Sequence, residues 1–323
     1  MKTLSKLAAA ALTCSVLFGC SSSGSDIPTV GVSQLVSHTS LNTIRDAFVE
    51  QMETLGYKDG ETIKYDFTDA SGQTSNLTSI MSQYQDEKVD AIVAIATPTA
   101  QAAANVSDEI PVVFSAVSDP VGAGLVKDMD KPSGNITGTS DEVQIDQILD
   151  LAKEINPEVK TVGFLYNASE ANSKANLEKA KKYCKENGLT LQEGTGSNLT
   201  ELQSAASVLC EQVDILLAPN DNTVASGMAA LSQIALDAGV PFYTGADSMV
   251  QDGGFATVGI DYENLGKETA NMVDKILKGK SPADIPVKVF KDDLNIYVNQ
   301  KVLDTLGITL PEDIQNNEHL VMM

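Results

Sequence analysis

Residues 91–104 of the chain read AIVAIATPTAQAAA. The first six of them, Ala91–Ala96, are all apolar and lack the polar alternation of a half-exposed strand. Such a run is typical of a strand in a parallel sheet, because helices cover both faces of that kind of sheet. The sequence therefore predicts a buried strand over 91–96, followed by a helix over 99–106.

The same alternation of short apolar strands and longer helical patterns extends from this stretch in both directions. In the first half we expect further strands at 29–33, 61–67 and 111–114, and further helices at 41–56 and 76–87. A Gly/Pro-rich stretch, 130–139, is interpreted as the connection out of this half. In the second half we expect helices at 143–155, 171–187, 199–210 and 223–239, and strands at 161–166, 189–193, 214–218 and 240–243. A strand at 255–259, a helix at 265–279 and a strand at 286–290 follow. The pattern predicts an α/β protein with two doubly wound parallel sheets.

The first 28 residues are interpreted as a lipoprotein signal and a linker. Lys2 and Lys6 precede the apolar run Leu7–Phe18, and Leu17-Phe18-Gly19-Cys20 closes it. The run is too short to span a hydrocarbon core of roughly 30 Å. We expect removal of residues 1–19, a lipid on Cys20 and a flexible linker over 20–28. The alternative is a cleaved, soluble secreted product.

Length and charge restrict the function further. Removal of residues 1–19 leaves 304 residues, more than one hydrophobic core usually serves, which favours two domains. The formal net charge of the whole chain is −22 at pH 7, and a surface of that sign repels phosphate backbones and anionic lipid heads. We therefore expect no nucleic-acid partner, and a membrane link only through the lipid.

The cysteines and histidines indicate neither a metal site nor a redox site. Cys184 and Cys210 fall on predicted helices that cover opposite faces of the second sheet, so we expect two separate buried thiols, with a disulfide as the alternative. No Cys/His set has metal-ligand spacing. The glycine-rich stretches 121–124 and 252–254 lack the strand and helix context of a dinucleotide-binding motif, and they are interpreted as turns. No metal or cofactor is expected.

Polar residues follow the predicted strands in both halves. In open parallel sheets, ligands bind beyond the carboxyl ends of the strands, where helix N-termini present unpaired N–H groups. We expect the loops at 34–40, 97–99, 115–119, 167–172, 220–222 and 245–247 to face one cleft, although each of their side chains is also an ordinary helix cap. The candidate ligand-binding residues are Gln34, His38, Thr97, Thr99, Ser115, Asp119, Asn167, Asn220, Asp221, Asp247 and Asp261.

The residue types of these loops limit the ligand. Arg45 is the only arginine of the chain, and a solvated surface role competes there with ligand binding. A ligand carboxylate is therefore expected at helix N-termini and hydroxyl groups, among them those of Thr97, Thr99 and Ser115. A ligand amine would pair with an acid, for which the candidates are Asp119, Asp221, Asp247 and Asp261. The candidates for an apolar wall are Val36, Leu41, Met249 and Tyr262.

His38 lies in the first strand-to-helix loop, where it either contacts a ligand or caps the loop. A nucleophilic arrangement with His38 as base and Ser37, Ser40 or Ser115 as attacker lacks a G-x-S-x-G elbow. No catalytic residue is expected, and the chain is interpreted as a binding protein rather than an enzyme.

Several segments together resemble a known family. The chain is similar to the tryptophan/tyrosine-type substrate-binding lipoproteins of ABC importers, which are themselves similar to the ribose-binding and repressor-core proteins. The segments that carry the resemblance are Gly31-Val32-Ser33-Gln34 with His38, AIATPTAQAAA at 94–104, FSAVSDPVGAGLV at 114–126, GNITGTSD at 134–141, SEANS at 169–173, PNDNTVAS at 219–226 and GGFATVGIDY at 253–262.

The resemblance implies a type I periplasmic-binding-protein fold, in which three crossings of the chain form a hinge between two domains. It implies a first domain of residues 29–140 and 260–282, and a second of residues 141–259 and 283–323. It also implies a monomer on the extracytoplasmic face of the cell membrane that captures a small zwitterion, an aromatic or other apolar amino acid, and presents it to a membrane permease. The alternatives are a sensory binding protein of the same fold and an importer protein for a sugar or nucleoside. A sugar is disfavoured because the chain has no tryptophan to stack on it.

Overall fold

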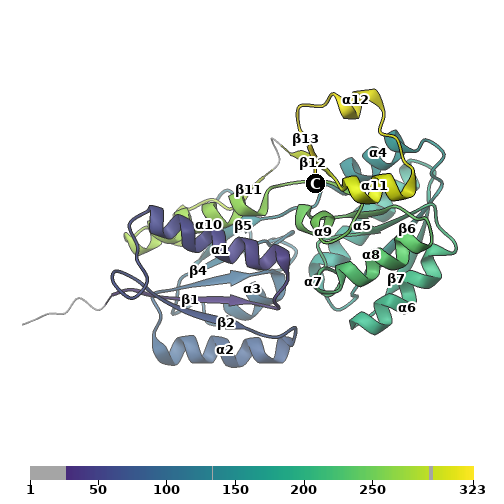
Figure 1. Cartoon of the computed structure of the whole chain (residues 1–323). Helices are drawn as coiled ribbons and strands as arrows, with labels where there is room; N and C mark the ends of the chain where they lie inside the picture. The colour runs from purple at the N-terminus through teal and green to yellow at the C-terminus, as the bar shows by residue number, and fades with distance from the viewer. Residues whose placement is uncertain (1–26, 133, 291–293) are drawn as a thin grey trace, which may run out of the picture.

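A parallel sheet forms the centre of the first domain in the computed structural model, which describes residues 27–132, 134–290 and 294–323 (Figure 1). Within these residues the strand order is β2-β1-β3-β4-β5-β11. The strands are β1 (Thr29–Gln34), β2 (Lys64–Asp69), β3 (Ala91–Ile95), β4 (Val112–Ser115), β5 (Ile136–Ser140) and β11 (Lys288–Val289). The apolar residues of β3 are fully buried, as expected for a strand covered on both faces.

Helices cover both faces of this sheet. One face carries α1 (Thr39–Thr54) and α10 (Tyr262–Leu277), which pack closely against each other. The other face carries α2 (Thr74–Glu87) and α3 (Thr97–Ala104) (Figure 1). Helix α10 comes from late in the chain, so the first domain consists of two segments that are distant in the sequence.

The second domain repeats this plan with an antiparallel extension. Its strand order is β13-β12-β10-β9-β8-β6-β7, and β12 runs antiparallel to β10 while the other neighbouring pairs are parallel. The strands are β6 (Thr161–Tyr166), β7 (Thr190–Thr195), β8 (Ile215–Ala218), β9 (Phe242–Thr244), β10 (Ala256–Gly259), β12 (Asn295–Val298) and β13 (Leu320–Met322).

The helices of the second domain also lie on both faces of its sheet. Residues of α4 (Ile145–Ile155) and α5 (Ala171–Glu186) form the core on one face, and residues of α6 (Leu199–Cys210) and α8 (Met228–Asp237) lie in the core on the other. Shorter helices complete it: α7 (Asn222–Ser226), α9 (Asp247–Gln251), α11 (Gln300–Leu306) and α12 (Glu312–Gln315). A 3-10 turn, Pro282–Asp284, follows α10 and contacts β5.

The chain passes between the two sheets after β5, after β10 and after β11. The predicted α/β class with two parallel sheets and a three-strand hinge is therefore confirmed. One boundary needs correction, because residues 283–323 were expected in the second domain. Strand β11 pairs in parallel with β5, so the segment up to Val289 lies on the first sheet.

Three further differences from the sequence prediction concern local structure. Residues 136–139, expected within a connection, form with Ser140 the strand β5, which is buried inside the first sheet. The helix expected at 223–239 is divided at Gly227, where an added Cβ would lie 2.1 Å from Leu199 Cδ1. The sequence pattern also missed α9 and the elements after β11. The interpretation of residues 1–26, including Cys20, lies outside the described residues.

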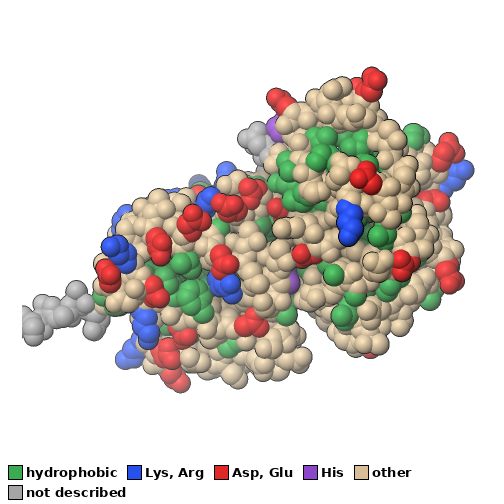
Figure 2. Space-filling model, in the orientation of Figure 1, with side chains coloured by type: hydrophobic (Ala, Val, Ile, Leu, Met, Phe, Trp, Pro, Cys, Tyr) green, Lys and Arg blue, Asp and Glu red, His purple; other side chains and the backbone are tan. Residues whose placement is uncertain are grey.

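Cys184 and Cys210 are both buried and free, which confirms the expectation of two separate thiols. They belong to the cores on opposite faces of the second sheet. Burial raises the pKa of each thiol to about 11, so both stay protonated near neutral pH. Figure 2 shows acidic side chains over both domains on the visible face. In the described part of the chain, no helix has the length and apolar character needed to cross a membrane.

The close approach of α1 and α10 gives a stability prediction. A Cβ added at Gly266 of α10 would lie 2.4 Å from the carbonyl oxygen of Ile44 in α1. Glycine to alanine inside a helix normally stabilises by up to about 1 kcal/mol. We expect Gly266→Ala to lower the free energy of unfolding instead, by about 1–3 kcal/mol, because the two helices must separate.

Thermal melting followed by circular dichroism measures this effect, with Gly259→Ala as the matched control. An added Cβ at Gly259 meets only Thr257, at 3.8 Å, which is an ordinary van der Waals contact. A melting temperature of Gly266→Ala at or above that of the wild type would contradict the close packing of these helices.

Candidate functional site

A small cavity with about 20 Å³ of free volume lies between the two domains. Both sheets share the strand order 2-1-3-4-5 in their parallel part, and ligands in such sheets bind where the order reverses, beyond the carboxyl ends of the first and third strands. Here these are the ends of β1 and β3 and of β6 and β8. The cavity is lined by His38, Ser40, Leu41, Ala96, Thr97, Ala116, Asp141, Asn172, Asn220, Asn222, Ala225, Met249 and Tyr262.

Asp141 is the acid on the cavity wall. It directly follows β5, at the first crossing between the domains, and is fully buried. Ser118 Oγ donates to its Oδ1 at 3.0 Å, and Tyr262 Oη donates to its Oδ2 at 2.8 Å. The Asn220 amide donates to the same Oδ2 and also to Ser118 Oγ, at 2.7 Å. Burial raises the pKa of Asp141 to about 6, and the three donors limit the rise.

A second network begins at Glu170, the N-cap residue of α5. Its Oε2 accepts from the Asn222 backbone N–H at 3.1 Å and from Asn222 Nδ2 at 2.6 Å, and its Oε1 accepts from Thr223. Asp221 caps α7 and accepts from Ser173 Oγ at 2.6 Å. Burial raises the pKa of both acids, and the charge of Asp221 raises that of Glu170 further.

The Glu170 network reaches the other domain through Asn222. His38 Nε2 lies 3.4 Å from Asn222 Oδ1, and burial lowers the pKa of the imidazole, which therefore stays neutral near pH 7. Nearby, Ser40 Oγ and Ser248 Oγ are 2.6 Å apart, also across the domain boundary. Together with the Asn220 amide, these contacts hold the two domains in a closed arrangement.

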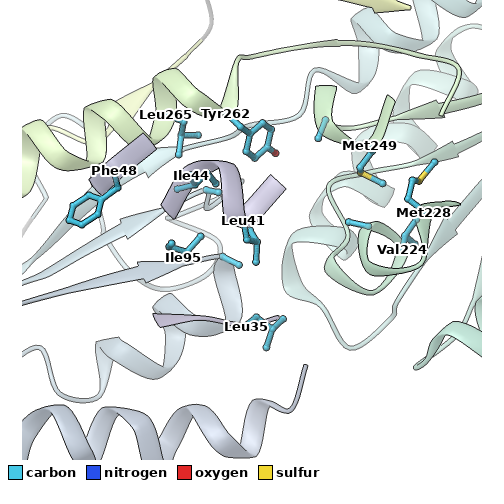
Figure 3. Packing of buried hydrophobic residues seen from close by; sticks show 14 of the residues in the cluster. Leu35, Leu41, Ile44, Phe48, Ile95, Val224, Met228, Met249, Tyr262 and Leu265 are labelled. Atoms are coloured by element: carbon cyan, nitrogen blue, oxygen red, sulfur yellow. The ribbon is translucent and has the colours of Figure 1, made fainter. Parts of the chain in front are cut away.

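Apolar residues form the rest of the cavity. Leu41 and Tyr262 approach from the first domain, while Met249 and Ala225 approach from the second. Figure 3 shows Leu41 and Tyr262 facing Met249 across the boundary. These side chains belong to one hydrophobic cluster that runs from the first domain into the second. The cavity therefore combines a polar side with an apolar side, as small-molecule sites commonly do.

Two alanines on the cavity wall have an unusual backbone. Ala96, between β3 and α3, has φ +79° and ψ 154°, and Ala116, after β4, has φ +56°. Residues other than glycine rarely adopt positive φ, and the conformation of Ala96 belongs almost entirely to glycine. Such strain costs about 1–3 kcal/mol per residue and is found mainly at functional sites.

The cavity brings together three of the residues selected from the sequence, His38, Thr97 and Asn220. The others do not line it. Gln34, Thr99, Ser115, Asn167 and Asp221 are buried nearby. Their polar groups bond mostly to protein: Gln34 Nε2 donates to Asn42 and Asp69, and Ser115 Oγ bonds to Thr269 at 2.8 Å. Thr99 Oγ1 is buried with no partner.

The remaining three candidates lie at helix starts or turns. Asp119 caps a turn by accepting from the Gly122 N–H at 2.8 Å, and Asp261 caps α10 by accepting from the Glu263 N–H at 2.7 Å. Asp247 begins α9, where burial raises its pKa to about 7. Of the four acids proposed for a ligand amine, none lines the cavity.

The sequence selection omitted Asp141, Asn172 and Asn222, which line the cavity. Asn172 and Asn222 belong to the predicted loops 167–172 and 220–222, so their position was available from the pattern. Asp141 follows β5, which was expected to be a connection, and no acid was sought there. Of the apolar-wall candidates, Leu41, Met249 and Tyr262 line this cavity, and Val36 lines a neighbouring groove.

The strained backbone of Ala96 gives a second prediction. Ala96→Gly loses a methyl group and gains chain entropy in the unfolded state, but it relieves the strain. Ala94→Gly, in the adjoining strand β3 and at an ordinary φ, has the same two losses without the relief of strain. We expect the free energy of unfolding of Ala96→Gly, measured by urea titration, to be at least about 1 kcal/mol higher than that of Ala94→Gly. Equal losses in the two variants would contradict the strain.

Comparison with known proteins agrees with this geometry. The chain matches the family "ABC transporter substrate binding protein" over residues 29–321. A curated relative, the tyrosine-binding protein of Clostridioides difficile, is 39% identical over 320 residues, covering 95% of this chain and 92% of the relative.

Two solved structures are informative about the arrangement of the domains. An ABC domain from Streptococcus pneumoniae in complex with L-Trp is 38% identical, with a TM-score of 0.87 over 91% of this chain and 100% of that chain. A ligand-free, open substrate-binding protein from Clostridium difficile is 41% identical, with a TM-score of 0.70 over 92% of this chain and 99% of that one. This structure is thus closer to the L-Trp complex than to the open form, although both are similar in sequence.

More distant solved solute-binding proteins share the type I periplasmic-binding fold. Family match, identity and fold agree over nearly the whole described chain. This protein belongs to the ABC transporter substrate binding protein family.

Proposed function

We propose that this protein captures an aromatic amino acid outside the cytoplasmic membrane and delivers it to the permease of an ABC importer. The observation that carries the proposal is the fully buried Asp141 on the wall of the inter-domain cavity. A carboxylate has about four lone-pair sites. Asp141 Oδ2 accepts two hydrogen bonds and Oδ1 accepts one, so Oδ1 keeps a site for a ligand ammonium group.

The ligand carboxylate would lie at the start of α3. Ala96 and Thr97 line the cavity there, and the first N–H groups of a helix have no acceptor within the helix. Arg45 does not compete for this role, because its guanidinium pairs with Asp46 at 2.8 Å. The hydroxyl of Thr97, which was also selected from the sequence, would add a further donor.

The ligand side chain would contact the apolar residues Leu41, Ala225 and Met249. An aromatic ring is favoured by two relatives: one is named tyrosine-binding protein, and one was solved with L-Trp. A sugar or nucleoside ligand remains the alternative for an importer protein, and presentation to a receptor remains the alternative to transport.

We further propose that the protein acts as a monomer, without covalent chemistry, and is tethered by a lipid on Cys20. Ligand binding between the domains favours the closed arrangement, because only that arrangement places both walls against the ligand. The permease then distinguishes closed from open protein.

The charge pair gives the central test. We expect the wild type, from Ser21 on, to bind L-tyrosine, L-tryptophan or L-phenylalanine in isothermal titration calorimetry. Asp141→Asn should raise Kd for the bound amino acid roughly 30-fold or more, since loss of one partner of a buried charge pair costs at least about 2 kcal/mol.

Asp247→Asn is the matched control, because Asp247 is also buried but does not line the cavity. Its Kd should stay within about 3-fold of the wild type. A stronger effect of Asp247→Asn than of Asp141→Asn would instead assign the ligand amine to Asp247, one of the four acids selected from the sequence. Binding of a sugar or nucleoside alone would refute the amino-acid proposal.

The lipid anchor is tested separately. In cells producing the full chain, we expect the wild type in the membrane fraction and Cys20→Ala in the soluble extracytoplasmic fraction, as followed by immunoblotting. Mass spectrometry of the wild type should show a diacylated N-terminal cysteine. An unmodified Cys20, or identical distribution of both proteins, would leave the secreted-product alternative standing.

A further inference from the structure

One ring nitrogen of His38 has no partner in the closed cavity. Nδ1 is buried and makes no hydrogen bond, while the residue lines the cavity wall. A buried polar atom left unpaired is costly, and it indicates that a partner absent from the protein itself completes the site. The character of Nδ1, donor or acceptor, therefore determines which ligand group meets it.

The Glu170 network fixes that character. Asn222 Nδ2 donates to Glu170 Oε2 at 2.6 Å, so the other end of the amide, Oδ1, faces His38. Oδ1 is an acceptor, and the ring nitrogen next to it, Nε2 at 3.4 Å, must carry the proton. In a neutral imidazole the other nitrogen is then unprotonated. Burial lowers the pKa of His38 and keeps the ring neutral, so Nδ1 is a bare acceptor.

A second unpaired acceptor belongs to Asn172, another residue that lines the cavity. Asn172 Oδ1 is buried without a partner, because its Nδ2 donates to the Asn220 carbonyl oxygen at 3.1 Å. Asn172 and His38 both line the cavity, one from each domain. Two residues that line the cavity thus carry unpaired acceptors, which favours a ligand group that donates.

We propose that His38 Nδ1 accepts a hydrogen bond from the side chain of the ligand, and that the site therefore selects aromatic amino acids with a ring donor, a phenol O–H or an indole N–H, against phenylalanine. The inference rests on the proposed function. The ligand ammonium is assigned elsewhere, since a cation is bound more strongly by the free lone pair of the Asp141 carboxylate than by a neutral imidazole. Phenylalanine would leave Nδ1 unpaired, and sites built around a hydrogen bond reject analogues that lack the donor.

A thermodynamic cycle that combines changes in His38 with changes in the ligand tests this assignment. Kd is measured by calorimetry for L-tyrosine, L-tryptophan and L-phenylalanine with the wild type, His38→Leu and His38→Asn. Leucine removes the acceptor. Asparagine places Oδ1 near the position of Nδ1 and keeps it, while both variants lose the contact between His38 Nε2 and Asn222. Thermal melting of each variant checks that the fold is intact.

We expect the wild type to bind phenylalanine at least 10-fold more weakly than the better of tyrosine and tryptophan. That ratio should fall below about 3-fold in His38→Leu, mainly through weaker binding of the ring donor, and should remain above 5-fold in His38→Asn. Equal weakening of all three ligands in His38→Leu would overturn the inference, because His38 would then act only on domain closure or on the common amino-acid group.

The failure of this inference is distinct from the failure of the proposed function. Wild-type protein that binds phenylalanine as well as tyrosine and tryptophan overturns the role of His38 and leaves amino-acid capture in place. Wild-type protein that binds none of the three overturns both.

Discussion

The carboxyl ends of parallel strands lie at the same edge of their sheet, and this constraint determines where the whole site lies. In both domains the strand order reverses between the first and third strands, so the loops after β1 and β3 and after β6 and β8 diverge to opposite faces. The divergence leaves a hollow at each edge that no helix fills. The two hollows face each other, and the cavity between them takes its walls from both domains. The fold thus creates the binding site without any dedicated element, and the loops need only supply the chemistry.

The buried acids near the cavity differ in how much of their acceptor capacity is used by donors of the protein. Glu170 and Asp221 accept hydrogen bonds from backbone N–H groups at the start of α7. They therefore position Asn222 and do not line the cavity themselves. Asp141 retains capacity and lies on the cavity wall. Burying a carboxylate is costly unless donors surround it. Three donors hydrogen-bond the carboxylate of Asp141 and offset part of the cost of its burial, and a ligand cation would compensate its charge.

The sequence predicted most of the fold because its signals are local. The apolar run at 91–96 and the similar runs around it define strands regardless of what packs on them. The prediction from the sequence failed at β5, Ile136–Ser140, because three of its five residues are polar and it follows glycine and proline residues. That strand is buried by segments far away in the chain: Thr137 donates to the Ile285 carbonyl oxygen, and Thr139 contacts Thr269 of α10. The site was found only in part for the same reason. Loops at strand ends were visible in the pattern, but which of their acids faces the cavity depends on how the two domains meet.

The position of Asp141 connects binding with closure. It directly follows β5, at one crossing between the domains, and its partner Tyr262 lies just after another. Its donors Ser118 and Tyr262 both belong to the first domain, so opening of the cleft would leave these two contacts in place. Asn220, in contrast, comes from the second domain and reaches Asp141 and Ser118 only when the domains meet. In an open form Asp141 would therefore lose a donor and gain water, whereas in the closed arrangement it is buried and a ligand cation would supply its counter-charge. On the proposed function, a ligand ammonium would stabilise the closed form more than the open one, and that difference in affinity would drive the domains together.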